Sequence, residues 1–227
     1  MSTDISTTTC SSTSTSSSFD NGRRGQFNAW FFTTFGQYIS HISGRQKRTA
    51  FEGIERGDIV ELGAGVGANF DYVPVGSRLI VIEPNLAMHT GLLQRGTDRG
   101  VDVALHAVSA EQIPLPDSSV DDVLCSLVLC TVEDQGAVLA EARRILRPGG
   151  RFRFVEHVAA RPWSPRRWLQ ETVRRPWRWV FEGCDLCRDT AGAIEAAGFS
   201  TVDVTRGRWR HSLFFPANSS IYGIAIR

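Results

Sequence analysis

The stretch VELGAGVGANF, residues 60–70, decides the fold of this chain. An apolar run that contains one acid, Glu61, leads into a turn with three glycines, Gly63, Gly65 and Gly67. Glycine has no Cβ and adopts a positive φ without strain, so such a turn lets backbone N–H groups approach a ligand closely. A helix that follows the turn favours negative charge at its N-terminal end. The stretch therefore predicts a strand, a ligand-binding turn and a helix, in that order.

The segments that follow alternate between strand and helix patterns. Helices are predicted between the glycine turn and Pro74, at 86–94, at 135–146 and at 190–197. Strands that alternate with helices of this length predict an α/β fold, in which helices cover both faces of a mainly parallel, seven-stranded sheet. The predicted strands are 58–62, 78–82, 101–106, 120–127, 151–158, 201–206 and 220–226.

Composition divides the chain into three parts. Residues 1–25 begin with a serine and threonine tract that is too polar to bury a core, which predicts a disordered leader. Residues 26–56 carry large apolar side chains at helical spacing, which predicts a helical lid that packs on the rest of the protein. Residues 57–227 form the ligand-binding domain, with an insertion at 159–189 that is rich in tryptophan and arginine. That insertion fits either a surface helix or a cap that faces the substrate.

Charge and cysteine content limit the partners and the compartment. The formal net charge is +1 at pH 7, so no global field attracts nucleic acid. Eleven arginines in residues 143–178 are interpreted as a solvated face, with an anion-binding surface as the alternative. Five cysteines leave an odd thiol, which favours a reducing compartment. No run reaches the roughly 20 apolar residues of a membrane span. We expect a cytoplasmic protein, with peripheral membrane contact through the aromatic lid as an option.

The glycine turn alone is ambiguous between two cofactors. Gly63, Gly65 and Ala68 satisfy the dinucleotide pattern G-x-G-x-x-G/A, whereas Glu61 with the three glycines satisfies acid-x-G-x-G-x-G. A carboxylate beside the turn would repel a pyrophosphate but would attract an ammonium group. S-adenosylmethionine carries an ammonium and a sulfonium, so it is the expected cofactor. An NAD-dependent oxidoreductase, and a catalytically silent module that docks on a membrane or a partner, are the alternatives.

Four motifs occur in the order VELGAGVGAN, IVIEPNLAM, VSAEQIPLPDSSVDDVLCSLVLCTV and ILRPGGRFRFVEHV. Together they resemble the class I S-adenosylmethionine-dependent methyltransferases, in particular the small-molecule group that contains the quinone and phospholipid enzymes. A later motif, EGCDLCRDTAGAIEAAGF, is similar to the methyltransferase-like proteins that methylate alkyl thiols. The resemblance spans about residues 57–206. It implies a Rossmann-like fold and methyl transfer to a small lipophilic acceptor, with a thiol favoured over a quinol or a lipid amine.

The resemblance also implies cofactor contacts, residue by residue. Glu61 and the three glycines would hold the methionine part, and Glu83 would accept hydrogen bonds from both ribose hydroxyls. Ser109 stands where the family often has an acid, so a backbone contact from Ala110 is expected at the adenine amino group. The remaining assignments are Asn85 and Met88 beside the adenine, Glu111 next to Ala110, and Ser126 and Leu127 along the channel to the acceptor.

The implied reaction needs little acid or base catalysis. The sulfonium already activates the methyl group, so alignment and the exclusion of water are the main requirements. His157, at the end of a predicted strand beside Glu156, is the candidate to receive or orient the proton of the acceptor, with a structural role as the alternative. Cys184 and Cys187 form one C-x-x-C without a second pair, so no metal site is expected. The sequence leaves the oligomeric state open.

Overall fold

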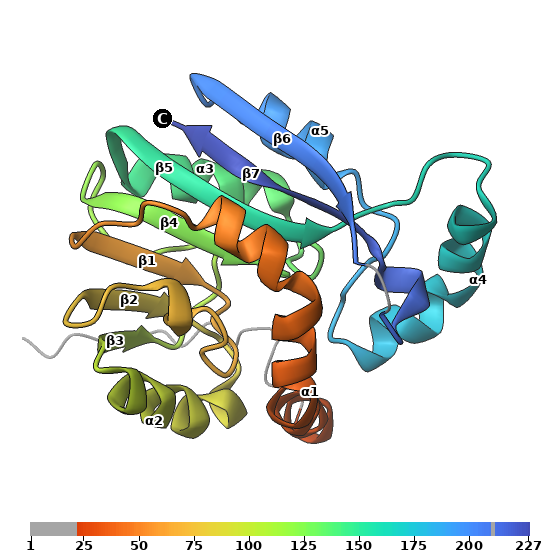
Figure 1. Cartoon of the computed structure of the whole chain (residues 1–227), viewed down its shortest axis with the longest axis horizontal. Coiled ribbons are helices and arrows are strands. Elements are labelled where there is room, and N and C mark those ends of the chain that lie inside the picture. The colour runs from red at the N-terminus through yellow and green to blue at the C-terminus, as the bar shows by residue number, and fades with distance from the viewer. Residues whose placement is uncertain (1–21, 210–211) are drawn as a thin grey trace, which may run out of the picture.

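The computed structural model describes residues 22–209 and 212–227, which form one sheet with helices on both faces (Figure 1). The strand order is β3-β2-β1-β4-β5-β7-β6. β7 runs antiparallel to β5 and β6, and the remaining neighbours are parallel. The predicted α/β fold with a mainly parallel sheet of seven strands is therefore confirmed. The strands are β1 (Asp58–Leu62), β2 (Arg78–Ile82), β3 (Asp102–His106), β4 (Val120–Ser126), β5 (Leu146–His157), β6 (Thr201–Arg208) and β7 (Ser219–Ile226).

The helices differ from the predictions mainly at their ends. The first one begins at Gly22, so residues 22–25 belong to the lid helix, although their composition predicted part of the leader. The apolar stripe ends at Ile42, whereas the helix extends beyond it at both ends, and Gly25 and Ala50 outside the stripe are buried. Residues 1–21, which hold the rest of the predicted leader, lie outside the described residues. The helices are α1 (Gly22–Ala50), α2 (His89–Arg99), α3 (Gln135–Ile145), α4 (Pro165–Val180) and α5 (Thr190–Ala196).

The short helix predicted between the glycine turn and Pro74 is present as a single helical turn. The chain there forms only a short 3-10 helix, η1 (Phe70–Tyr72), which ends before Pro74. A second 3-10 helix, η2 (Leu86–Met88), leads directly into α2. A third, η3 (Phe215–Ala217), precedes β7. Among the described residues, no helix combines the length and the apolar character that crossing a membrane requires.

Strand alternation divides the buried side chains between two cores, one on each face of the sheet. Val60 and Leu62 of β1 point to the core that α3 and α5 cover. Ile59 points to the opposite core, which contains Ala50 at the end of α1 and Leu92 of α2. Glu61 alternates with Val60 and Leu62, so its side chain lies on the face covered by α1. The acid inside the apolar run is therefore buried beneath the lid helix.

Arg153 of β5 attaches the end of α1 to the sheet. Its guanidinium is 1% exposed and donates hydrogen bonds of 3.0 Å and 2.7 Å to the backbone carbonyls of Ala50 and Glu52. It also forms an ion pair with the buried Asp122 of β4. The last carbonyls of a helix have no partner within the helix and carry partial negative charge, so an arginine satisfies them well. This contact fixes the lid helix over the strand ends.

The tryptophan-rich insertion contains α4 and lies beside the carboxyl ends of the strands (Figure 1). Ser164 caps α4 by accepting a hydrogen bond of 3.1 Å from the N–H of Arg167. Trp163, Trp168 and Trp179 are exposed, whereas Trp177 faces the large pocket described below. The insertion is therefore both a surface helix and a part of the pocket wall.

Candidate active site

One large pocket lies at the carboxyl ends of β1, β2, β4 and β5, beneath α1. Parallel strands of an open α/β sheet place ligand sites at this edge, because the loops that follow the strands meet there. Leu127, directly after β4, adopts a φ of 63°, a strained conformation that is common at functional sites. The predicted residues that line this pocket are Gly63, Gly65, Glu83, Asn85, Met88, Ser109, Ala110, Ser126, Leu127 and His157.

Three predicted cofactor residues do not line the pocket. Glu61 lies behind the wall, where its carboxylate accepts a hydrogen bond of 2.7 Å from the side chain of Asn69. Gly67 is packed against Phe70, so an added Cβ would come within 2.9 Å of that ring. Glu111 turns away and accepts hydrogen bonds from Ser109 and from the backbone of Glu133. These residues shape the walls and the turn. The sequence motif alone did not distinguish them from the residues that line the pocket.

The first two glycines of the turn have different roles. Gly63 has a φ of 56°, and an added Cβ would lie 2.6 Å from the Val128 side chain. Gly65 has a φ of 57°, but an added Cβ would meet only Met88, at 3.7 Å. The backbone N–H of Gly65 donates a hydrogen bond of 2.8 Å to the carboxylate of Glu83. Packing therefore requires glycine at 63, and the turn conformation requires it at 65.

Glu83 is fixed at the end of β2 by the backbone around it. One carboxylate oxygen accepts the N–H of Gly65, and the other accepts the N–H of Asn85 at 2.8 Å. Burial raises the pKa of Glu83, while these two hydrogen bonds act in the opposite direction. Each carboxylate oxygen keeps a second lone pair, so Glu83 can still accept hydrogen bonds from a diol in the pocket.

A buried lysine, which was not among the residues predicted from the sequence, faces the same end of the pocket. Lys47 of α1 is 2% exposed and lines the pocket together with Asn69. Burial lowers its pKa to about 8, and burial raises the pKa of Glu61 to about 7. One oxygen of Glu61 and the side-chain oxygen of Asn69 have no hydrogen-bond partner among the described residues. The only signal in the sequence was that Lys47 is the single lysine of the chain.

The other end of the pocket is aromatic. Phe31 of α1 lies 5.1 Å from Phe181 and 5.5 Å from Phe214 between ring centroids. Trp177 of α4 contacts Phe181 at 4.6 Å. All four side chains line the pocket. The cavity thus joins a polar end, suited to a charged cofactor, with an apolar end, suited to a lipophilic molecule.

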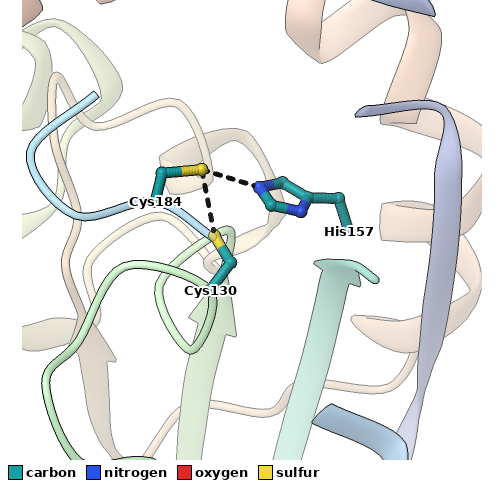
Figure 2. A group of neighbouring side chains, drawn as sticks. All are labelled: Cys130, His157 and Cys184. Carbon is teal, nitrogen blue, oxygen red and sulfur yellow. Dashed lines mark hydrogen bonds between the residues drawn. The ribbon is translucent and has the colours of Figure 1, made fainter. Parts of the chain in front are cut away.

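Two thiols and an imidazole meet where the loops after β4 and α4 approach the end of β5 (Figure 2). His157 Nε2 lies 3.0 Å from Cys184 Sγ, and Cys184 Sγ lies 3.9 Å from Cys130 Sγ. All three residues are buried and line the pocket. Burial raises the pKa of the Cys130 thiol well above its usual range. Cys184 belongs to the C-x-x-C with Cys187 in the sequence, and in the structure it is grouped with Cys130 and His157.

Comparison with known proteins agrees with this arrangement. Residues 60–154 match the family model described as a methyltransferase domain. Human thiol S-methyltransferase TMT1A is 34% identical over 181 residues, which are 75% of this chain and 74% of that protein. The chain belongs to the class I S-adenosylmethionine-dependent methyltransferases. The methyltransferase is also 36% identical to mouse thiol S-methyltransferase TMT1B over 174 residues, 74% of this chain and 70% of the relative.

Solved structures support the fold of the methyltransferase independently. An S-adenosylmethionine-dependent methyltransferase from Mesorhizobium loti superposes with a TM-score of 0.62 at 21% identity, over 82% of this chain and 98% of that one. Phosphoethanolamine N-methyltransferase 2 from Haemonchus contortus, in complex with S-adenosyl-L-methionine, gives a TM-score of 0.67 at 14% identity, over 93% and 60% of the two chains. Together with the methyltransferase-domain match and the relatives at 34% and 36% identity, the predicted family, cofactor and enzyme class are confirmed.

The residues of the polar end fit S-adenosylmethionine. Lys47 offers a positive charge for the carboxylate of the methionine part. The unpartnered side-chain oxygen of Asn69 offers an acceptor for its ammonium, and the carboxylate of Glu61 lies behind Asn69. The bare backbone at Gly65 leaves room beside the carboxylate of Glu83. A ligand with both charges and a ribose diol would satisfy groups that are otherwise buried at a cost in free energy.

Proposed function

We propose that this methyltransferase transfers the methyl group of S-adenosylmethionine to the sulfur of a small, lipophilic thiol. The observation that carries the proposal is the aromatic end of the pocket, which converges on the buried Cys130, His157 and Cys184. The relatives named thiol S-methyltransferases support the same acceptor class. A quinol or a lipid amine would fit the apolar walls equally well, so the choice of sulfur rests on the relatives and on the polar cluster.

The cofactor would lie with its methionine part toward Lys47 and its ribose on Glu83. Asn85 and Met88 line the wall beyond Glu83, where we place the adenine, with the backbone of Ala110 at its amino group. The main change from the sequence prediction concerns which residues bind the methionine part. Glu61 would act on it from behind Asn69, and Lys47 would bind its carboxylate.

The chemical step would be an in-line displacement. A lone pair of the acceptor sulfur forms the new S–CH₃ bond as the bond between the methyl group and the sulfonium breaks. The products are a thioether, S-adenosylhomocysteine and one proton. His157 faces the pocket near the acceptor end, so we assign it the contact with the acceptor sulfur. α1 and the aromatic walls contribute by excluding water and restricting the approach of the thiol.

A methyl-transfer assay with labelled S-adenosylmethionine tests this function. Alkyl thiols of increasing chain length, matched quinols and matched amines would be compared at the same concentration. We expect kcat/KM to be highest for thiols and to rise with chain length, because each buried methylene contributes about 0.8 kcal/mol. Phe31→Ala should flatten the dependence on chain length, while Phe51→Leu, a conservative change in the core away from the pocket, should not. Transfer to amines or quinols but not to thiols would overturn the assignment of the acceptor.

A further inference from the structure

We propose that Cys130, His157 and Cys184 bind one Zn²⁺ ion and leave its fourth position open to the acceptor. The metal site stands on the geometry of the three side chains, and only its role toward a thiol rests on the proposed function. The sequence predicted no metal site, because it offered a single C-x-x-C. The structure shows that the candidate ligands come from three separate segments, the loop after β4, the end of β5 and the loop after α4 (Figure 2).

The ligand types are those that zinc prefers. Two thiolates and one imidazole form a soft set that is typical of Zn²⁺, and three protein ligands with one open position are typical of a catalytic zinc site. The three ligand atoms lie within 4.8 Å of one another. All three side chains are at least nine-tenths buried, with 8% exposure at Cys184, 5% at His157 and 1% at Cys130. Converging soft donors in the wall of a buried pocket point to a thiophilic cation.

The distance between the two sulfurs fits tetrahedral coordination, whereas the distance between His157 and Cys184 requires an adjustment. Two Zn–S bonds of about 2.3 Å at a tetrahedral angle place the sulfurs about 3.8 Å apart. The sulfurs of Cys130 and Cys184 are 3.9 Å apart. His157 Nε2 and Cys184 Sγ are 3.0 Å apart, so this pair would open by about 0.5 Å to reach the separation that Zn–N and Zn–S bonds require.

The surroundings favour a neutral metal centre. One Zn²⁺ with two thiolates has no net charge, which suits a buried site with apolar walls. The indole N–H of Trp177 donates a hydrogen bond of 3.2 Å to Cys184 Sγ, an interaction that stabilises a thiolate ligand. The three side chains all line the cavity, so the fourth position of the metal faces the space for the acceptor.

Zinc would activate the acceptor thiol without a protein base. On binding, Cys130 and Cys184 each release a proton to solvent. The acceptor thiol then loses its proton to solvent and binds as a thiolate, because a coordinating thiol is deprotonated by the ion. Its sulfur lone pair attacks the methyl group, and S-adenosylhomocysteine leaves with the electron pair of the broken bond. The neutral thioether is a weaker ligand than a thiolate and dissociates. In this scheme His157 is a zinc ligand and does not take up the proton.

Metal binding to the full chain tests the site without any measurement of activity. The protein, freed of metal, is titrated with Zn²⁺ alone in competition with a chromogenic chelator, and with Co²⁺ alone in a spectrophotometer. We expect one ion per chain, with thiolate-to-Co²⁺ charge-transfer absorption and the visible bands of tetrahedral cobalt. An absence of these bands, or no binding of Zn²⁺ in competition, would overturn the proposal.

Single substitutions test whether these residues are the zinc ligands. Cys130→Ser and Cys184→Ser should each weaken Zn²⁺ binding by roughly tenfold or more. Cys187→Ser is the matched control, because it changes the other cysteine of the same C-x-x-C and should keep the affinity of the wild-type protein. Equal zinc affinity in all three variants would contradict the assignment.

Calorimetry with S-adenosylhomocysteine verifies that each variant is folded. Combined with the methyl-transfer assay, it also distinguishes a failure of the zinc site from a failure of the proposed function. Metal-free protein that binds the cofactor product and methylates thiols at the full rate would refute the role of zinc and leave the function intact. Zinc binding in a protein that methylates no thiol would support the metal site and refute the proposed function.

Discussion

The backbone N–H of Gly65 donates a hydrogen bond of 2.8 Å to the carboxylate of Glu83, and so links the glycine turn after β1 to the end of β2. The same carboxylate accepts the N–H of Asn85 through its other oxygen. Two backbone donors thus fix both oxygens of Glu83 before any ligand binds. A carboxylate oriented in this way loses little entropy when it accepts further hydrogen bonds, which is the condition for tight binding of a diol.

Glu83→Ala should weaken binding of S-adenosylhomocysteine on the order of 1–3 kcal/mol, or roughly 5-fold to 150-fold in Kd. The loss arises from the hydrogen bonds to the ribose and from the freed N–H groups of the turn. Isothermal titration calorimetry provides the measurement. Asp98→Asn, on the exposed end of α2, is the control and should bind as the wild type does. An unchanged Kd for Glu83→Ala would remove the ribose assignment.

Gly63→Ala should lower the free energy of unfolding more than Gly65→Ala does. Both substitutions impose a positive φ on alanine, which costs roughly 1–2 kcal/mol. Only Gly63→Ala adds a contact of 2.6 Å with Val128, and overpacking of this kind costs roughly 1–3 kcal/mol more. Gly91→Ala, at a helical site with open space, should instead stabilise by about 0.5–1 kcal/mol. Urea unfolding would compare the three variants, and the reverse order for Gly63 and Gly65 would contradict the packing argument.

Glu61→Gln should change how stability depends on pH. Burial raises the pKa of Glu61 from its usual 4.5 to about 7, so the folded protein binds a proton that the unfolded chain has already released. The contribution of Glu61 to stability is therefore present below pH 4.5 and is lost as the pH rises to about 7. Glutamine cannot titrate, so the variant should gain stability relative to the wild type across this window, by up to about 3 kcal/mol.

Urea unfolding at a series of pH values between 4 and 8 measures this difference. Glu133→Gln, on the exposed surface, controls for the loss of one negative charge. Parallel curves for Glu61→Gln and the wild type would show that Glu61 does not titrate in this range. Repeating the series with S-adenosylhomocysteine should reduce the difference, because the ammonium of the ligand favours the charged form of Glu61.

Arg153→Met should destabilise the protein by about 3–5 kcal/mol, since it leaves the buried carboxylate of Asp122 and the end of α1 without their partner. The double variant Arg153→Met, Asp122→Asn should recover part of this loss, because the uncompensated charge is removed as well. Urea unfolding measures both effects. Limited proteolysis should also cleave near Ala50 faster in Arg153→Met. Equal stability of the single and double variants would show that the ion pair is not the main contribution.

The sheet and the ligand edge could be predicted from local patterns. The apolar run with its single acid predicted the position of β1, and the glycines at 63 and 65 predicted the turn that follows it. The family resemblance pointed to Glu83, which directly follows the next strand, and parallel strands end at the same edge. The short helix predicted before Pro74 is a 3-10 helix, a type that the sequence did not specify because 3-10 and α-helices have similar local signals.

The sequence by itself determined the class of fold, the family and the end of the sheet where the pocket lies. Those features depend on periodicity and on motifs within a few consecutive residues. Only the tertiary structure decided that Lys47 shares a buried region with Glu61, and that His157 and Cys130 lie beside Cys184, 27 and 54 residues away along the chain. Such contacts depend on strand order and on how α1 and α4 pack across the strand ends, and no local spacing of residues records that packing.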